Sequence, residues 1–197
     1  MMLPTEKPDE IRSKYDARLT ELENLELERA MADDAPVDSM VDMYLHMMAI
    51  YLIQNDLPNA KFLWKRIPEN AKKGQSLLGL HRILLALWAR DFPGVYVALG
   101  SVEWPEPLQP LITDLRALTV LRAQLLLAQS YSDISQEDFC ALMAVSPADV
   151  VHACTELGWS VKEGRVQPTA QSLPADEVLP SEEHLAKLAE FISFLEC

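Results

Sequence analysis

Apolar residues recur at helical spacing over most of the chain. From Val41 to Ile53 they occupy positions i, i+3, i+4, i+7, i+8, i+11 and i+12, which predicts a helix with a broad buried face. Similar spacing predicts long helices over residues 11–31, from residue 77 to about 90, and from about 107 to 125. The chain is therefore predicted to be mainly α-helical.

Shorter helices are predicted between the long ones. Asp56 and Asp91 stand where a long helix ends, and Pro58 and Pro93 fall in the first turn of the helix that follows. Proline is tolerated there because its missing N–H would have no partner within the helix. The alternation of long and short helices predicts stacked antiparallel helix pairs, as in helical solenoids, although no strict sequence period is detectable.

The first short helix holds two residues expected in the core, Trp64 and Ile67, on the same stripe as Ala60 and Leu63. Trp64-Lys65-Arg66 has a second interpretation as a small basic contact patch. The preferred interpretation places Trp64 between stacked helices and the two basic side chains in water, because an aromatic residue on an apolar helical stripe is usually part of a core.

After the last long helix the pattern changes. Two short helices with capping serines are predicted, the second beginning at Ser146 and ending at Gly158. Trp159, Val161 and Val166 then alternate with polar residues around a glycine-containing turn, which predicts a small β-hairpin. Short helices followed by a hairpin predict a winged-helix module, with Trp159 in its core.

The C-terminal segment is predicted to be a separate amphipathic helix that follows a proline-rich linker. An isolated helix this short is marginal in water, so it must bury its apolar stripe, either on a partner or on its own domain. The predicted interface residues of this helix are Leu185, Leu188, Phe191, Ile192, Phe194 and Leu195. The predicted organisation is a leader and acidic helix (1–34), a helical-repeat part (35–132), a winged helix (133–168), a linker (169–180) and a C-terminal helix (181–197).

Charge and composition narrow the classes of function. The 197 residues include 17 Lys and Arg against 30 Asp and Glu, a net charge of −13 that disfavours nucleic acid and anionic membranes as partners. The predicted second helix of the winged helix carries no Lys or Arg, so DNA binding is disfavoured further. No apolar run reaches membrane-spanning length, and three widely spaced cysteines suit a reducing compartment. A soluble intracellular protein is expected.

No catalytic, metal or cofactor site is expected from the motifs. The six glycines form neither GxGxxG nor GxSxG, and Leu80 stands where a P-loop would need lysine. Cys140, His152 and Cys154 are candidates for zinc ligands or for a Cys–His nucleophile pair. Ordinary core and surface roles are preferred, because positions 152 and 154 point to different faces of a helix and no activating cation adjoins them.

Several segments, in order along the chain, resemble a family of PCI-domain scaffold subunits. Residues 55–68 (NDLPNAKFLWKRIP), 90–96 (RDFPGVY), 157–159 (LGW) and 188–196 (LAEFISFLE) resemble signature segments of the family of the smallest, eighth subunit of the COP-nine signalosome. Residues 21–28 (ELENLELE) are similar to that family's N-terminal helix. The resemblance covers nearly the whole chain, with residues 72–87 sharing only the apolar pattern.

This resemblance implies a non-catalytic scaffold subunit of a complex, found in cytoplasm and nucleus, that removes a ubiquitin-like modifier from cullins and so regulates cullin-RING ubiquitin ligases. It implies no cofactor and no small-molecule substrate. It also implies partners: other subunits would pair with the edge of the wing, at Val161 and Val166, and with the C-terminal helix in a shared bundle. The equivalent proteasome-lid subunit and the k subunit of translation initiation factor three, of the same broader family, remain the alternatives.

Overall fold

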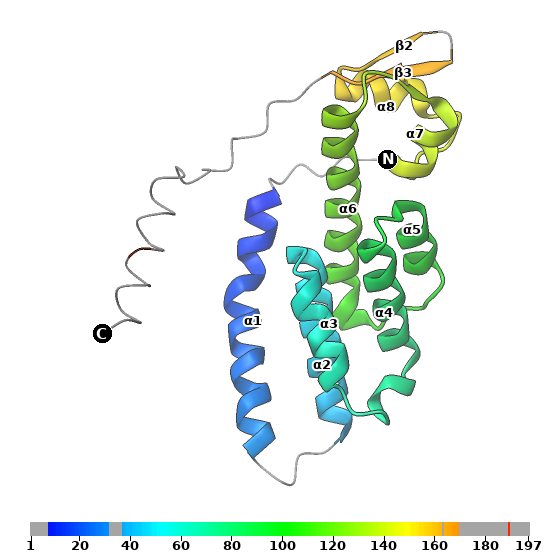
Figure 1. The fold of residues 1–197 in the computed structure, drawn as a ribbon. Helices are drawn as coiled ribbons and strands as arrows, with labels where there is room; N and C mark the ends of the chain where they lie inside the picture. The colour runs from blue at the N-terminus through cyan, green and yellow to red at the C-terminus, as the bar shows by residue number, and fades with distance from the viewer. Residues whose placement is uncertain (1–7, 32–36, 163, 170–188, 190–197) are drawn as a thin grey trace.

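The computed structural model describes residues 8–31, 37–162, 164–169 and 189 (Figure 1). The predicted linker (169–180) and C-terminal helix (181–197) therefore lie outside the described residues, apart from residues 169 and 189. The helices are α1 (Pro8–Met31), α2 (Val37–Gln54), α3 (Leu57–Arg66), α4 (Gln75–Trp88), α5 (Phe92–Gly100), α6 (Gln109–Ser130), α7 (Gln136–Met143) and α8 (Val150–Leu157). The strands are β1 (Ile134–Ser135), β2 (Ser160–Lys162) and β3 (Arg165–Gln167), and 3₁₀ turns lie at Ala71–Lys73 and Glu106–Leu108.

Figure 1 shows α1 to α6 stacked side by side, with α6 continuing into a second layer formed by α7, α8 and the sheet. The mainly helical fold predicted from the periodicity is confirmed. The predicted stripe of α2 is buried along its length, with Leu52 and Ile53 both fully excluded from solvent. Burial of that stripe against α1, α4 and α6 makes α2 the centre of the helical part.

The same turn joins α2 to α3 and α4 to α5. Asn55 and Arg90 adopt left-handed φ values of 63° and 58°, which ends the preceding helix. The next residue in each turn, Asp56 or Asp91, accepts a hydrogen bond from a backbone N–H in the first turn of the following helix, at 3.1 Å and 3.0 Å respectively. These carboxylates satisfy N–H groups that have no partner within the helix. The predicted helix pairs thus share one capping device.

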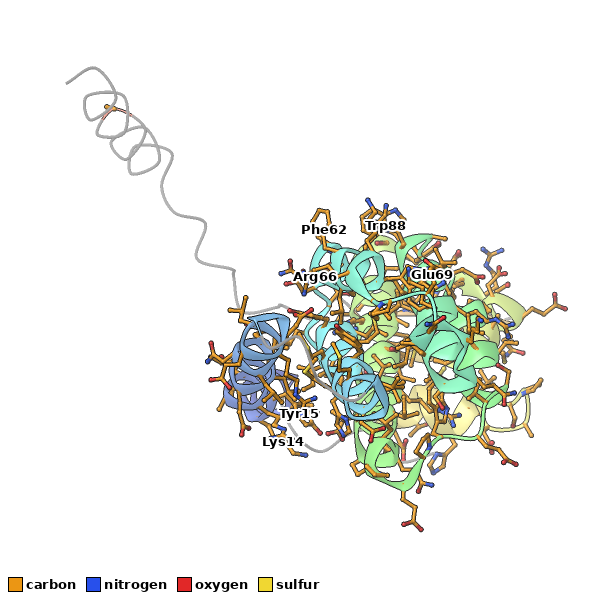
Figure 2. All side chains as sticks on the ribbon, turned by 90° about the horizontal axis from the view of Figure 1, so that it is seen from below. Lys14, Tyr15, Phe62, Arg66, Glu69 and Trp88 are labelled. Atoms are coloured by element: carbon orange, nitrogen blue, oxygen red, sulfur yellow. The ribbon has the colours of Figure 1, made fainter. Side chains whose placement is uncertain are left out.

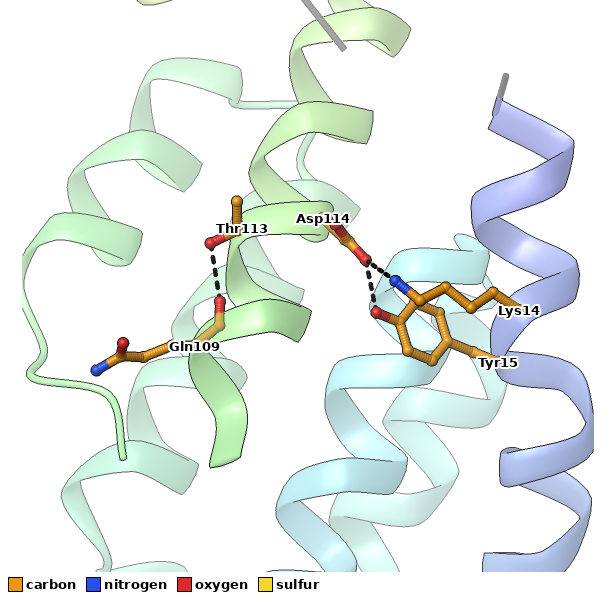
Figure 3. A network of polar contacts seen from close by, with 5 residues as sticks. All are labelled: Lys14, Tyr15, Gln109, Thr113 and Asp114. Carbon is orange, nitrogen blue, oxygen red and sulfur yellow. Dashed lines mark hydrogen bonds and ion pairs between the residues drawn. The ribbon is translucent and has the colours of Figure 1, made fainter. Parts of the chain in front are cut away.

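Helix α1 is fixed to the stack by polar contacts. Asp114 of α6 accepts hydrogen bonds from the Tyr15 hydroxyl at 2.5 Å and the Lys14 ammonium at 3.3 Å (Figure 3). Further along, the Tyr51 hydroxyl of α2 donates to the Glu23 carboxylate at 2.6 Å. Burial, followed by the hydrogen bond to the nearby carboxylate, raises the pKa of both tyrosines. The phenols therefore remain protonated donors at neutral pH.

Two clusters of buried side chains form the core. The first lies among α1 to α6, and the second lies between the end of α6, α7, α8 and the sheet. Phe139 is fully buried in the second cluster and meets the Trp159 ring edge to face, with centroids 6.0 Å apart. The Tyr96 hydroxyl of α5 donates to the Leu142 carbonyl of α7 at 2.9 Å, which ties the two layers together.

The sheet has three strands in the order β1–β3–β2, and both pairings are antiparallel. The hairpin of β2 and β3 was predicted, whereas β1 was not. Helix α8 begins at Val150 rather than at Ser146, so the predicted start was three to four residues too early. The Ser146 hydroxyl donates to the Asp149 carboxylate at 2.8 Å, and the backbone from Ser146 to Asp149 forms a separate turn. The predicted end at Gly158 is confirmed by its φ of 71°.

Candidate protein–protein interfaces

The outer edge of β2 is open among the residues that the structure describes. The backbone N–H of Gln136 donates to the carbonyl of Gly164 at 3.4 Å, in register with the pairing of Ile134 to Val166. Hydrogen-bonded pairs alternate along an antiparallel ladder, so the N–H and C=O of Val166 point toward β1. The N–H and C=O of Val161, which lies opposite Val166 on β2, therefore point away from the sheet.

This register corrects the expectation for Val166. The residue is fully buried on the central strand, because β1 covers the side of β3 that the hairpin prediction left open. The side chain of Val166 therefore packs in the second core cluster, and its strand is paired on both sides. Val161 is half-buried and lies on the outer strand, where its backbone groups are available to a partner strand.

The predicted core residues differ in their burial. Ile67 is 1% exposed and Trp159 5% exposed. Trp64 is only half-buried: its ring stacks on that of His81 at 3.9 Å, with the Lys72 ammonium 5.5 Å from the ring centroid. It therefore lies at the rim of the first core cluster, partly exposed to solvent. The six predicted interface residues of the C-terminal segment lie outside the described residues.

An exposed aromatic and basic face on α3 and α4 is larger than the basic patch considered at Trp64-Lys65-Arg66, and its aromatic residues Phe62 and Trp88 were not predicted. Phe62 and Trp88 project from the same side of the molecule and are 54% and 51% exposed (Figure 2). The Lys61 ammonium lies 4.3 Å from the centre of the Trp88 ring, and the Lys65 ammonium lies 5.8 Å from that of Phe62. The sequence does contain one indication of this face, which is its local charge. Residues 57–90 contain seven Lys and Arg but only one Asp or Glu, in a chain of net charge −13.

The surface of α8 does not resemble a DNA-reading helix. Its sequence, VVHACTEL, carries no Lys or Arg, and the exposed ring of His152 lies 3.7 Å from the Glu156 carboxylate. The largest exposed apolar side chain on this helix is Val151, which is 63% exposed. Lys and Arg supply much of the affinity for DNA phosphates, and this helix carries neither.

The two cysteines that the structure describes, Cys140 and Cys154, lack the features of nucleophiles or ligands. Burial raises the pKa of the Cys140 and Cys154 thiols, and Cys140 raises that of Cys154 further. Both therefore favour the neutral thiol, whereas nucleophilic cysteines are thiolates. Over the described parts of the chain, no group of three or more His, Cys, Asp or Glu side chains is placed to hold a metal ion. Of the described helices, none is long and apolar enough to cross a membrane.

The stacked helices, which run through α6 into two short helices and a three-stranded antiparallel sheet, are consistent with a PCI-like fold. The sequence profile of the CSN8/PSMD8/EIF3K family matches residues 38–178. The chain is 36% identical over 157 residues to COP9 signalosome complex subunit 8 of Xenopus tropicalis. These aligned residues cover 78% of this chain and 81% of that protein. The subunit 8 of Drosophila melanogaster is 31% identical over 93% of this chain and 98% of that protein. In Arabidopsis thaliana the protein of the same name is 26% identical over 77% of this chain and 78% of that protein.

The chain belongs to the CSN8/PSMD8/EIF3K family, and the similarity to signalosome subunit 8 extends over both the helical part and the winged helix. The family resemblance predicted from the sequence segments is confirmed.

Proposed function

We propose that this protein is a non-catalytic scaffold subunit of the COP9 signalosome, working in cytoplasm and nucleus. In this role it contributes no reacting group to the removal of the ubiquitin-like modifier from cullins. It affects cullin-RING ubiquitin ligases by holding other subunits in place. The observation that carries the proposal is the similarity to Drosophila signalosome subunit 8, which spans 98% of that protein.

Two contacts would tie the subunit into the complex. The first is the edge of β2, where the outward N–H and C=O of Val161 suit the addition of a strand from another subunit's winged helix. Three residues form this strand, so backbone pairing would set orientation while neighbouring side chains supply most of the affinity. The second contact is the C-terminal segment 181–197, whose apolar residues would enter a bundle of partner helices.

Affinity purification of the tagged full-length chain from its own cells, followed by mass spectrometry, tests the assignment. We expect the remaining signalosome subunits in stoichiometric yield. The family profile also names the proteasome-lid and initiation-factor-three members. Recovery of proteasome-lid or initiation-factor subunits in place of signalosome subunits would overturn the proposal.

The Val161→Pro substitution tests the edge contact within the same purification. Proline removes the outward donor and leaves the hydrogen bonds between β2 and β3 in place, because those are made by the residues on either side. Val161→Ala is the matched control, since it loses the same packing against the wing but keeps the N–H. We expect Val161→Pro to reduce co-purification of partners and Val161→Ala to retain it; equal recovery with both variants would contradict edge pairing. Removal of residues 181–197 should likewise reduce recovery if the second contact is correct.

A further inference from the structure

We propose that the outer face of α3 and α4 is a second docking surface, which binds an acidic amphipathic helix of a partner protein. This inference goes beyond the proposed function and does not rest on it. The face comprises Lys61, Phe62, Trp64 and Lys65 of α3 with Leu78, His81, Leu85 and Trp88 of α4. We call it the α3/α4 face.

The apolar part of the α3/α4 face follows one side of α4. Leu78, His81, Leu85 and Trp88 are spaced at i, i+3, i+7 and i+10, so they lie along one stripe of about three turns. Leu78 is 39% and Leu85 is 55% exposed. Scattered apolar residues on a surface need no explanation, but a contiguous stripe beside exposed aromatic rings is typical of a protein-binding site.

The two helices are joined by ring contacts that hold the aromatic side chains outward. Trp64 stacks on His81 with the rings 12° from parallel, and the Lys61 ammonium lies over the Trp88 ring. Burial and the nearby Lys72 charge lower the pKa of His81, so its ring is neutral at physiological pH. Because the imidazole is uncharged, the Trp64–His81 stack adds apolar surface to the α3/α4 face, next to the leucine stripe.

The charged part of the α3/α4 face selects an acidic partner. The Arg66 guanidinium forms an ion pair with the Glu26 carboxylate of α1, with an N–O distance of 2.8 Å. The Lys72 ammonium forms one with the Glu69 carboxylate, also at 2.8 Å. Lys61 and Lys65 differ, since neither forms an ion pair with any carboxylate in the described part of the chain, and their ammoniums lie over aromatic rings instead. They remain available to carboxylates of a partner.

The partner is a protein rather than a nucleic acid or a membrane because of the remaining charge. Outside residues 57–90 the chain has ten Lys and Arg against 29 Asp and Glu, a field that repels an extended polyanion. A short helix with Glu or Asp beside Leu or Phe would match the two lysines and the leucine stripe together. Recognition of an amphipathic helix through i, i+3 and i+7 anchors is an established mode of binding.

A fluorescently labelled synthetic helix of about three turns, with Glu on one face and Leu and Phe on the other, tests the proposal by anisotropy. A matched peptide with Lys in place of each Glu tests the sign of the charge. We expect the full-length chain to bind the Glu peptide, with affinity that falls as salt rises, and to bind the Lys peptide at least about tenfold more weakly.

Two variants locate the binding. The double variant Lys61→Glu, Lys65→Glu reverses the free charges, and Phe62→Ala with Trp88→Ala removes the protruding rings; each should weaken binding by about tenfold or more. All four side chains are exposed, so melting temperatures should change little.

The matched controls are Lys162→Glu on the wing and Val97→Ala on α5, where the valine is 72% exposed. Both should bind the Glu peptide like the unmodified chain. Equal binding of the two peptides, or wild-type affinity in both α3/α4 variants, would overturn the proposal. So would tighter binding of single-stranded RNA or of anionic lipid vesicles that is lost in the Lys61→Glu, Lys65→Glu variant. Since no signalosome subunit takes part in these measurements, their outcome is independent of the co-purification result.

Discussion

Replacing Phe139 by alanine should destabilise the winged helix strongly. The side chain is fully buried between α7 and the sheet, and its ring meets Trp159 at an interplanar angle of 65°. Deleting a buried phenylalanine side chain costs about 3–5 kcal/mol, from lost transfer free energy together with the cavity that remains. About 0.5–1.5 kcal/mol of this is the loss of the edge-to-face pair. The total loss of about 3–5 kcal/mol is a large fraction of the ~5–15 kcal/mol that stabilises a typical domain.

Urea unfolding followed by far-ultraviolet circular dichroism measures this loss. With a slope of about 2–3 kcal/mol per molar urea, the midpoint should fall by about 1–2 M. Phe62→Ala is the matched control, because it removes the same side chain from a position that is 54% exposed, and it should change stability by less than about 0.5 kcal/mol. Phe139→Leu should lie between them, at about 1–2 kcal/mol, since it keeps most of the volume but loses the ring pair. Equal midpoints for Phe139→Ala and Phe62→Ala would refute the assignment of Phe139 to an enclosed core.

Two further predictions concern pH and helix packing. Burial raises the pKa of Tyr96 to about 12, and the pKa of Tyr15 is also raised, whereas an unfolded tyrosine titrates near pH 10. The folded state thus favours the protonated phenols, so the free energy of unfolding should hold below about pH 10 and decrease as pH rises toward 12; an unchanged urea midpoint over that window would contradict this. A Cβ at Gly79 would lie 3.0 Å from the Trp104 ring, which is held by its own N–H hydrogen bond, whereas one at Gly100 would meet nothing within 4 Å. Gly79→Ala should therefore be less stable than Gly100→Ala by about 1–3 kcal/mol in thermal melts, and equal stability would show that this packing can relax.

The helices could be predicted because their local signals agree with their tertiary packing. In α2 the predicted apolar stripe coincides with buried positions, although Met47 and Ile50, which lie off that stripe, are buried as well. In the turns before α3 and α5 an Asp cap and an early proline act within a few residues. Strand β1 has no such signal. Ile134 and Ser135 are too few to show an alternation, and they become a strand only because β3 offers a pairing edge. The position of Val166 on the central strand followed from that unpredicted strand.

The part of the α3/α4 face that α4 contributes was missed for a different reason. Helix α4 has apolar residues around much of its circumference, with Leu77 and Leu84 buried but Leu78 and Leu85 exposed. A period identifies such a helix but does not say which leucines meet another helix, because that depends on the neighbours that cover it. The concentration of basic residues in 57–90 could have marked this region, since a local excess of positive charge stands out in an acidic chain.

Helix α6 joins the two parts of the fold, because this one helix contributes side chains to both cores. Its first half contributes Leu111 and Leu115 to the helical cluster, and its second half contributes Ala123 and Leu127 to the winged-helix cluster. Twenty-two residues of α-helix extend over about 33 Å, with buried residues from Leu111 to Ala128. The hydrogen bond from Tyr96 to α7 adds a second connection between the layers. The β2 edge and the α3/α4 face lie on the two parts of the fold that α6 joins, so α6 would link a partner bound at one surface to a partner bound at the other (Figure 1).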